Sequence, residues 1–553
     1  MLVPPKWNVE QTTLDVQTNE KGELYYSARG KPVIIEPISE EESFLFRADP
    51  DLLVGDIEVT EEYVRETNEN GETSIYRLRA LQHWGFWSLL PALCAVVLCW
   101  ITKEPITALL GGIVSGALIL GQYDLTGSVL IPALGTTSVA GILILYLWLL
   151  GGLLGIWSKS GAALAFAEWI TKAVVRGPRT AKLVAWMLGI TFFQGGTVST
   201  VLVGTTVRPI ADKENISHEE LAYIVDSTAS PIASQLAFNA WPAYVQAFIF
   251  VSGVTFLATE ADRIAFFFAS VPFCFYAIFA VLGTFLLSIE KPLFLGKKMK
   301  AAMERARSTG QLDAEDAAPL ALPEDSQSQA PVGYTASPLE FILPLILLIS
   351  VAVGTFVAFG SPNVHWAFGL ALLVAGGMAL LKGLTLRELV DGFSQGIRSV
   401  VGGSVILLLA VTIGGVSTQT GGGTYLVQLL GSAIPWFLLP VLLQLMTMTI
   451  AFSTGTSWGT YAVAFPLAMP LAWAVANSQG IDHPWFFMTL CFAAVMDGSV
   501  YGDQCSPISD TTVLSSMCTG CDLMDHVKTQ IPQATFAAVL AAIAWTVLAY
   551  FAG

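Results

Sequence analysis

The sequence is poor in charged residues, which make up only 13% of its 553 positions. It has seven cysteines, most of them within or beside apolar runs, so we expect no disulfide framework. Acidic residues outnumber basic ones by 43 to 27, which leaves no basic surface for nucleic acid and predicts no nucleic-acid partner. The polar amino-terminal segment lacks a charged start followed by an apolar core, so it does not resemble a signal peptide.

Hydrophobic residues make up 54% of the chain, with 31 Phe and 15 Trp, a composition typical of a multi-spanning membrane protein. The charges are unevenly placed. Residues 1–82 carry 17 acidic and 8 basic residues, residues 289–337 carry 7 and 6, and the other 422 residues carry only 19 and 13. A charge inside a bilayer costs about 3 kcal/mol, so each of these few charges should be paired, interfacial or functional.

The first 82 residues predict a small β-rich appendage. Two segments, ELYYSARGKPVIIEPI and EVTEEYVRETNENGETSIYRL, alternate β-branched, aromatic and polar residues, and Asn70-Gly71 is a typical hairpin turn in the second. Because no export signal precedes this region, we expect residues 1–82 to remain in the cytoplasm.

Apolar runs begin at Trp84 and form two blocks of similar length, residues 83–288 and 338–553. Their lengths predict an all-α polytopic membrane protein with about eleven to thirteen crossings of the lipid bilayer. Between the blocks, residues 289–337 hold six Lys and Arg beside a membrane exit, which predicts a cytoplasmic linker.

The two blocks share short motifs in the same order. FQGGT starts at Phe193 and FSTGT at Phe452, and a Ser-Pro-Ile triplet follows each, at 230–232 and 506–508. Matched order and offset favour a duplication. Duplicated halves with interrupted apolar segments are typical of a secondary transporter whose site lies where the interruptions meet. The alternative is that these small residues serve helix packing alone.

Three stretches combine carboxylates and hydroxyls with helix-breaking Gly or Pro: DSTASP (226–231), FSTGTSWGT (452–460) and GDQCSPISDTT (502–512). A broken helix frees backbone carbonyls, and carboxylate, hydroxyl and carbonyl oxygens are the ligands of a hard cation. No basic residue lies in these stretches, which argues against an anionic substrate. The predicted sodium and proton site consists of Asp226, Thr228, Ser230, Thr454, Thr456, Ser457, Asp503, Ser506, Asp510 and Thr511, with Ser453, Asp497, Ser509 and Thr512 beside it.

The same aspartates have a simpler interpretation, because Asp and Ser often cap helices at break points. Gln235 and Asn239 likewise either add oxygen ligands or bond between helices. Arg208 and Asp212, four residues apart, are expected to form an interfacial ion pair.

Two further motifs suggest other chemistry. GTSWG (455–459) matches a nucleophile pattern that needs a strand–turn–helix setting and a histidine, and since it interrupts a membrane segment we expect no enzyme. Cys518 and Cys521 form a CxxC near His526, but without a second ligand pair we favour packing over a metal site.

Buried carboxylates also suggest how transport is coupled. Desolvation and a neighbouring carboxylate both raise a carboxyl pKa, so an empty site takes up protons that sodium then displaces. If the site moves only when neutralised by one or the other, exchange is obligatory.

The sequence resembles the NhaC-type sodium/proton antiporter family in RPIADKENISHEELAYIVDSTASPIA (208–233), FSTGTSWGT and GDQCSPISDTTVLSS (502–516). The resemblance implies a bacterial or archaeal inner-membrane carrier of the ion transporter superfamily, with inverted repeats, re-entrant hairpins and an elevator-like motion. It implies exchange of sodium or lithium for protons, no cofactor, and Asp226, Asp503 and Asp510 with nearby Ser and Thr as ion ligands.

Residues 1–82 and 289–337 lie outside that family's usual core. Some relatives move amino acids or organic acids, so a sodium-coupled transporter or exchanger of such a solute stays the alternative. It would require a cation for the solute carboxylate, and Arg208 or Arg398 would have to point into the cavity. The sequence leaves the oligomeric state open, a homodimer included.

Overall fold

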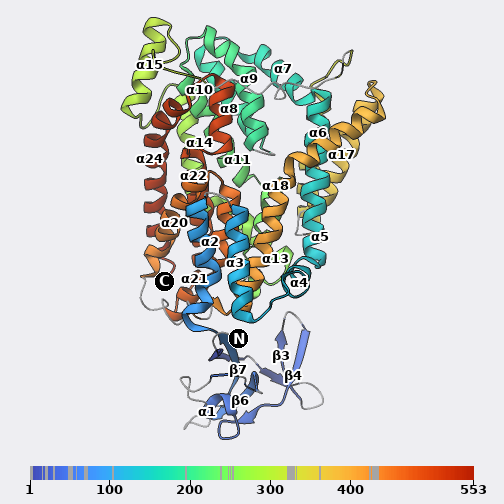
Figure 1. The fold of residues 1–553 in the computed structure, drawn as a ribbon, viewed down its shortest axis with the longest axis vertical. Coiled ribbons are helices and arrows are strands. Elements are labelled where there is room, and N and C mark those ends of the chain that lie inside the picture. Colours follow the sequence, from blue (N-terminus) through green and yellow to red (C-terminus); the bar gives the residue numbers. More distant parts are fainter. Residues whose placement is uncertain are drawn as a thin grey trace.

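The computed structural model is mostly helical, with a few strands at the amino-terminal end (Figure 1). The residues that it describes are 4–553 except 15, 19–22, 29–30, 48–53, 56, 58, 68–72, 103–104, 194–195, 237–238, 247, 250, 252–253, 320–330, 332, 360–362, 423–424 and 426–434.

The strands form two small sheets, which confirms the predicted β-rich appendage. One sheet has the order β1-β7-β6-β5 and the other the order β2-β3-β4. Both predicted hairpins are present, β3 with β4 and β6 with β7, each pair antiparallel, while Asn70-Gly71 lies outside the described residues. The strands are β1 (Lys6–Thr13), β2 (Val16–Thr18), β3 (Leu24–Ala28), β4 (Lys31–Ile35), β5 (Ile38–Ser39), β6 (Glu61–Thr67) and β7 (Thr73–His83).

The helices that follow make up the rest of the molecule. In chain order they are α1 (Phe44–Arg47), η1 (Gly85–Leu89), α2 (Leu90–Thr102), α3 (Pro105–Leu120), η2 (Leu125–Leu130), α4 (Ile131–Leu134), α5 (Thr137–Leu143), η3 (Ile144–Leu150), α6 (Gly151–Ser160), α7 (Ala162–Val174), α8 (Pro178–Thr191), α9 (Gly196–Lys213), α10 (His218–Ser227), α11 (Ser230–Gln235), α12 (Ala240–Val245), η4 (Thr255–Leu257), α13 (Glu260–Ser270), η5 (Val271–Phe273), α14 (Phe275–Ser288), α15 (Lys297–Thr309), α16 (Leu339–Phe359), α17 (Val364–Leu381), α18 (Leu386–Gln419), η7 (Trp436–Leu438), α20 (Leu439–Thr454), α21 (Ser457–Ser478), α22 (Pro484–Cys505), α23 (Asp510–Thr519) and α24 (Leu523–Tyr550).

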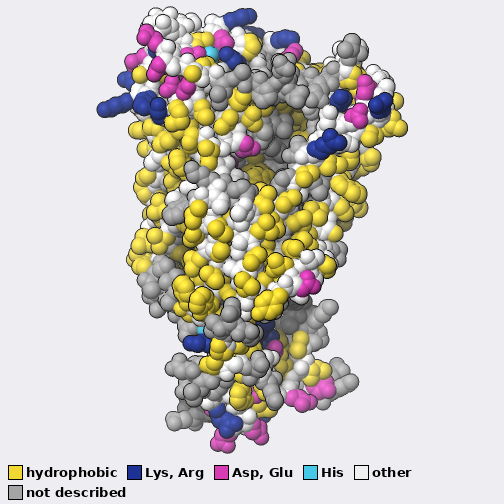
Figure 2. Space-filling view, viewed as in Figure 1, with side chains coloured by type: hydrophobic (Ala, Val, Ile, Leu, Met, Phe, Trp, Pro, Cys, Tyr) yellow, Lys and Arg dark blue, Asp and Glu magenta, His cyan; other side chains and the backbone are white. Residues whose placement is uncertain are grey.

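Hydrophobic side chains cover most of the middle of the helical body, and charged side chains gather toward its ends (Figure 2). Among the described residues, six helices are long and apolar enough to cross a membrane, or up to nine if each bent pair counts as one span. This apolar belt identifies a multi-pass membrane protein.

The number of long spans is lower than the predicted eleven to thirteen, because several apolar runs are broken. The run predicted over 232–258 divides into α11, α12 and η4, and the run over 129–157 divides into η2, α4, α5, η3 and α6. Such breaks free backbone groups inside the membrane, where they need protein partners.

The two segments predicted to be cytoplasmic lie at opposite ends of the helical body. In Figure 1 the strands of residues 1–82 lie at the bottom, whereas α15, in the linker, lies at the top. This placement argues against one common side of the membrane for the two segments, and the side that each occupies stays a prediction.

Close packing of α20 against α22 positions the most polar part of the membrane region. Gly498 and Gly502 form a GxxxG pattern on α22, and a Cβ atom on either would lie 2.2–2.5 Å from Thr447 or Ala451 of α20. Only glycine allows this approach of the two helices. Asp503, the next residue on α22, is thereby held beside the break after α20.

Candidate ion-binding site

Three interrupted pairs of helices meet at the candidate site. Each interruption is short and contains Gly, Pro or Ser or is followed directly by Ser-Pro, because these residues end a helix or begin the next one. The interruptions separate α10 from α11 at residues 228–229, α20 from α21 at 455–456, and α22 from α23 at 506–509.

Asp503 is the centre of the first cluster. Its Oδ2 accepts hydrogen bonds from Ser457 Oγ at 2.9 Å and from Ser230 Oγ at 3.3 Å, and its Oδ1 accepts one from Ser509 Oγ at 2.6 Å. Thr511 Oγ1 lies 3.1 Å from Ser509 Oγ. The hydroxyls come from the starts of α11 and α21 and from the break before α23, so both membrane blocks contribute to one carboxylate.

The Asp503 carboxylate is buried in the apolar part of the molecule, and the described residues offer it no ion pair. The three hydroxyls that surround it can donate to the ionised carboxylate or turn their lone pairs toward a bound cation. This arrangement suits a small hard cation that binds and leaves.

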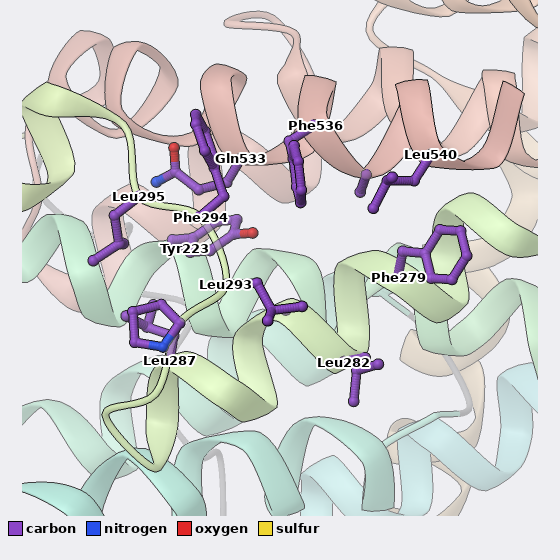
Figure 3. A pocket seen from close by; sticks show the side chains of 13 residues that line it. Tyr223, Phe279, Leu282, Leu287, Leu293, Phe294, Leu295, Gln533, Phe536 and Leu540 are labelled. Carbon is purple, nitrogen blue, oxygen red and sulfur yellow. The ribbon is translucent and has the colours of Figure 1, made fainter. Parts of the chain in front are cut away.

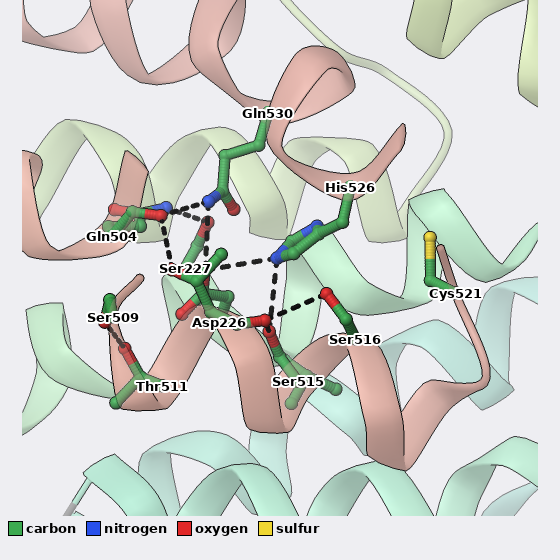
Figure 4. Close-up of polar contacts among 12 residues, drawn as sticks. Asp226, Ser227, Gln504, Ser509, Thr511, Ser515, Ser516, Cys521, His526 and Gln530 are labelled. Carbon is green, nitrogen blue, oxygen red and sulfur yellow. Dashed lines mark hydrogen bonds and ion pairs between the residues drawn. The ribbon is translucent and has the colours of Figure 1, made fainter. Parts of the chain in front are cut away.

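Asp226 is the centre of a second cluster, at the end of α10 (Figure 4). Its Oδ2 accepts hydrogen bonds from Gln530 Nε2 at 2.9 Å and from Thr512 Oγ1 at 3.3 Å, and it lies 3.2 Å from His526 Nε2. His526 Nε2 also lies 3.1 Å from Ser515 Oγ. Thr512 and Ser515 lie on α23, and His526 and Gln530 lie on α24, so these contacts tie α10, α23 and α24 together.

Two residues join the clusters. Thr512 Oγ1 reaches the backbone carbonyls of Asp503 and Gln504 at 3.3 and 2.9 Å, besides Asp226. Gln504 Nε2 donates to Ser227 Oγ at 2.7 Å, and its Oε1 accepts from Tyr276 Oη at 2.5 Å. A change at one carboxylate can therefore be transmitted to the other through the broken end of α22.

Asp510 differs from the prediction of a buried carboxylate, because its side chain is exposed. It is the first residue of α23, and its Oδ1 accepts from the backbone N–H of Thr511 at 2.9 Å. A carboxylate at a helix N-terminus is stabilised by the helix dipole without leaving water, so burial was not required at this position.

Four predicted hydroxyl ligands turn away from the carboxylates. The hydroxyls of Thr228 and Thr454 donate to backbone carbonyls one turn earlier in their own helices, at 2.8 and 3.0 Å. Thr456 Oγ1 caps α21 by accepting from Gly459 N, and Ser506 Oγ donates to the Phe452 carbonyl at 2.7 Å. Of the predicted hydroxyls, the structure brings Ser230 and Ser457 directly to Asp503, with Thr511 one step away.

Asn239 and Asp497 stabilise breaks. Asn239 Nδ2 donates to the Phe193 carbonyl at 2.9 Å, just as Ser506 donates to that of Phe452, its counterpart in the second block. Asp497 Oδ2 accepts from the Tyr276 backbone N–H at 2.7 Å, at the start of α14. Gln235 Nε2 reaches the Cys274 carbonyl at 3.4 Å. These hydrogen bonds hold the backbone at the breaks, while the buried Asp497 Oδ1 has no hydrogen-bond partner within the described residues.

The GTSWG stretch joins two helices and does not lie in the strand–turn–helix setting that its nucleophile pattern requires. Ser457 of GTSWG begins α21 and donates to Asp503. Cys518 and Cys521 are free and buried, and no group of three or more His, Cys, Asp or Glu in the described part of the chain is placed to hold a metal ion. Arg208 forms the expected pair with Asp212, with 3.8 Å between Nε and Oδ2.

Sequence reasoning missed His526, Gln504 and Gln530 as members of the site. Gln504 lies within GDQCSPISDTT, and His526 and Gln530 follow it by 22 and 26 residues on α24, which only folding brings against α10. The signal available in the sequence was a polar run, DHVKTQ, at the start of an apolar helix.

A family model described as the Na+/H+ antiporter family matches residues 240–550. An uncharacterised protein of Haemophilus influenzae is 31% identical over 496 residues, which cover 84% of this chain and 91% of that protein. A malate-2H+/Na+-lactate antiporter of Bacillus subtilis is 30% identical over 38% of this chain and 45% of its own length. An arginine/ornithine antiporter of Halobacterium salinarum is 31% identical over 31% of this chain and 33% of its own length.

Proposed function

Because the chain belongs to the Na+/H+ antiporter family, we propose that this membrane transporter exchanges sodium or lithium for protons, with Asp503 as the central ion ligand. The observation that carries the proposal is the environment of Asp503. It is a buried carboxylate with hydroxyls from both membrane blocks and no ion pair within the described residues. Ser230, Ser457, Ser509 and Thr511 are the proposed ligands around it.

The exchange follows from the electrostatics of that environment. An ionised carboxylate held in a medium of low dielectric constant must be neutralised, and either Na+ or H+ does so. When Na+ binds, the serine hydroxyls direct oxygen lone pairs to the ion; when a proton binds, the Asp503 carboxyl becomes a hydrogen-bond donor. Both cargoes use the same oxygens, so one excludes the other.

Asp226 is proposed as the second carboxylate of the transport cycle. Its contacts with His526 and Gln530 hold one oxygen, and its other oxygen, Oδ1, has no hydrogen-bond partner among the described residues. A buried oxygen without a partner is costly and is a position where a cation or water can bind. Asp510, exposed at the start of α23, is proposed to serve ion entry.

The orientation we propose places the linker in the cytoplasm and the β-rich appendage outside. Basic residues cluster around the linker end, where Arg179 Nε and Lys182 Nζ lie 2.9 and 3.6 Å from carboxylate oxygens of Glu290. An excess of Lys and Arg marks the cytoplasmic side of a membrane protein. We also retain the two blocks, 83–288 and 338–553, as inverted repeats of an elevator-like transporter.

The second candidate function is sodium-coupled transport or exchange of an amino acid or small organic acid. It is favoured by the names of two relatives, a malate-2H+/Na+-lactate antiporter and an arginine/ornithine antiporter. Against it, Arg208 is engaged with Asp212 and Arg398 is exposed, so neither supplies a cation beside Asp503. If this second function holds, Asp503 and Asp226 bind the coupling ion.

The test is transport by the purified full chain in liposomes that carry a pH gradient. Adding NaCl outside should move protons, without any organic solute, and Asp503→Asn should abolish the movement because the amide cannot exchange a proton. Asp482→Asn, which removes an exposed carboxylate between α21 and α22, is the matched control and should transport normally. A strict need for an organic solute would favour the second function, and wild-type rates in Asp503→Asn would overturn both.

A further inference from the structure

A groove on the outer face of the helical body lies beside the Asp226 cluster, because its lining residues Tyr223 and Gln533 are each three residues from Asp226 and Gln530 on the same helices. It runs between α14 and α24 and is closed at one end by the segment that leads from α14 to α15 (Figure 3). Its walls are apolar over most of their length, with Phe279 and Leu282 on α14 facing Phe536 and Leu540 on α24. Because this face lies in the apolar belt, the groove is open to the hydrocarbon of the bilayer.

One polar side chain stands at the closed end. Gln533 lines the groove and is only 6% exposed, yet in the part of the chain that the structure describes neither its Nε2 nor its Oε1 has a hydrogen-bond partner. A buried amide without partners is unfavourable, so a ligand that supplies them is stabilised there. Gln533 and Leu287 lie at this end in Figure 3, whereas Leu540 and Phe279 lie at the other.

The N-terminus of α15 adjoins Gln533. Gly296, the residue before α15, is so close that a Cβ atom on it would lie 2.9 Å from Gln533 Oε1. No side chain caps this helix, although α15 is 13 residues long. Free backbone N–H groups and the positive end of the helix dipole attract an anion.

Three lysines lie close to this point along the chain. Lys291 precedes the segment that closes the groove, and Lys297 and Lys298 are the first two residues of α15. All three are exposed, and none has an ion pair among the residues that the structure describes. The basic side chains over α15 are visible at the upper left of Figure 2. An anionic group at the start of α15 would be met by lysines, helix N–H groups and the Gln533 amide together.

The groove has the length of part of a lipid chain. Gln533 and Leu540 are seven residues apart on α24, which corresponds to roughly 10 Å along the helix axis. A ligand that fits must therefore be anionic at one end and apolar for at least this distance beyond it. Soluble phosphates have the first property only.

We propose that this groove binds an anionic phospholipid. Its phosphate lies at the start of α15 beside Lys291, Lys297 and Lys298, its glycerol and ester oxygens pair with the Gln533 amide, and one acyl chain follows the groove toward Leu540. The bound lipid would tie the linker to α24 at the membrane surface. This site does not depend on which ion or solute the protein transports.

The test is native mass spectrometry of the purified full chain, titrated with phosphatidylglycerol or with phosphatidylcholine. Phosphatidylglycerol should bind at least tenfold more tightly. The double variant Lys297→Gln, Lys298→Gln should weaken its binding roughly 25-fold, since each basic residue near an anionic lipid contributes about a fivefold effect. The control pair Arg176→Gln, Lys213→Gln removes two exposed charges from the same end of the molecule and should change little.

Two more variants separate the lipid site from general charge attraction. Gly283→Leu should fill the groove, because only Tyr223 Oη lies as near as 4.0 Å to a Cβ there, and it should weaken binding of both lipids. Gln533→Leu removes the unpartnered amide, so it should weaken phosphatidylglycerol binding while the protein stays at least as stable. Equal affinity for both lipids, equal losses in the control pair, or full competition by glycerol 3-phosphate would overturn the proposal.

Discussion

At the scale of single residues, the decisive feature is the set of serine hydroxyls on Asp503. Ser457 and Ser230 share its Oδ2, and Ser509 occupies its Oδ1. Each hydroxyl lies at the first turn of a helix or in a break, where the backbone does not compete for it. Thr228, directly after α10, and Thr454, the last residue of α20, instead bond back to the helix that precedes the break. Position relative to the break therefore decides whether a hydroxyl is available to an ion.

Replacing Ser457 should weaken ion binding without unfolding the protein. Ser457→Ala removes a 2.9 Å bond to Asp503, and a hydrogen bond to a charged group contributes about 1.5–3 kcal/mol. We expect the half-maximal sodium concentration for proton movement in liposomes to rise roughly tenfold or more. Ser453→Ala is the control within the same stretch, since Ser453 Oγ donates to the Thr449 carbonyl of its own helix. Equal sodium dependence in the two variants would remove Ser457 from the site.

At the scale of elements, the break between α20 and α21 brings two parts of the site into contact. Gly455 has φ +68° and its missing Cβ would lie 2.7 Å from the Ile508 carbonyl oxygen, in the break after α22. A residue with a side chain meets both a left-handed backbone and a steric clash here. The glycine thus allows the FSTGTS and SPISD stretches to touch.

Gly455→Ala should reduce both stability and transport. The left-handed conformation costs about 1 kcal/mol or more for alanine, and the contact with Ile508 adds to it by pushing the two breaks apart. Gly480→Ala is the matched control, because Gly480 has φ +63° but nothing within 4 Å of its Cβ position. The melting temperature and the rate of sodium-driven proton movement should both fall further in Gly455→Ala than in Gly480→Ala. Equal behaviour of the two variants would show that the contact between the breaks is unimportant.

At the scale of the whole molecule, the linker is anchored to the membrane region by ion pairs. His218, at the start of α10, lies 3.1 Å from Asp212 Oδ1 and 2.8 Å from Asp313 Oδ1 of the linker. Burial opposes protonation of this imidazole, but the hydrogen bonds and charges of the two aspartates outweigh it and raise the pKa of His218 to about 9. Arg305 adds a second anchor through Glu219, at 2.8 Å.

The pKa of His218 predicts a pH-dependent attachment of the linker. Since the folded pKa of about 9 exceeds the ordinary value near 6.5, the stabilisation is complete below about pH 6.5 and is lost as the pH rises through 9. A shift of this size corresponds to about 3 kcal/mol. The melting temperature should fall between pH 6.5 and 9.5, and His218→Gln should flatten that slope. An unchanged slope in the variant would assign the pH dependence to other groups.

The arrangement of the two polar regions predicts labelling on opposite sides of the membrane. Glu41→Cys places a thiol on the β-rich appendage and Ser308→Cys places one on α15, both at exposed positions. In intact cells, a membrane-impermeant maleimide should label Glu41→Cys and leave Ser308→Cys unlabelled until the membrane is opened. Labelling of both in intact cells would contradict the opposite placement of the two regions.

Much of this protein follows from local sequence chemistry. Apolar runs specify membrane helices, alternating residues specify the small sheets, and Gly or Ser-Pro-Ile specifies where helices break, since each depends on neighbours in the chain. Which side chains meet at those breaks depends on packing of distant helices. Contact between α10 and α24 brought His526 and Gln530 to Asp226, helix geometry turned Thr228 and Thr454 away, and an unburied helix start left Asp510 exposed. Side-chain direction and burial are properties of the assembled bundle, so only the tertiary structure decided them.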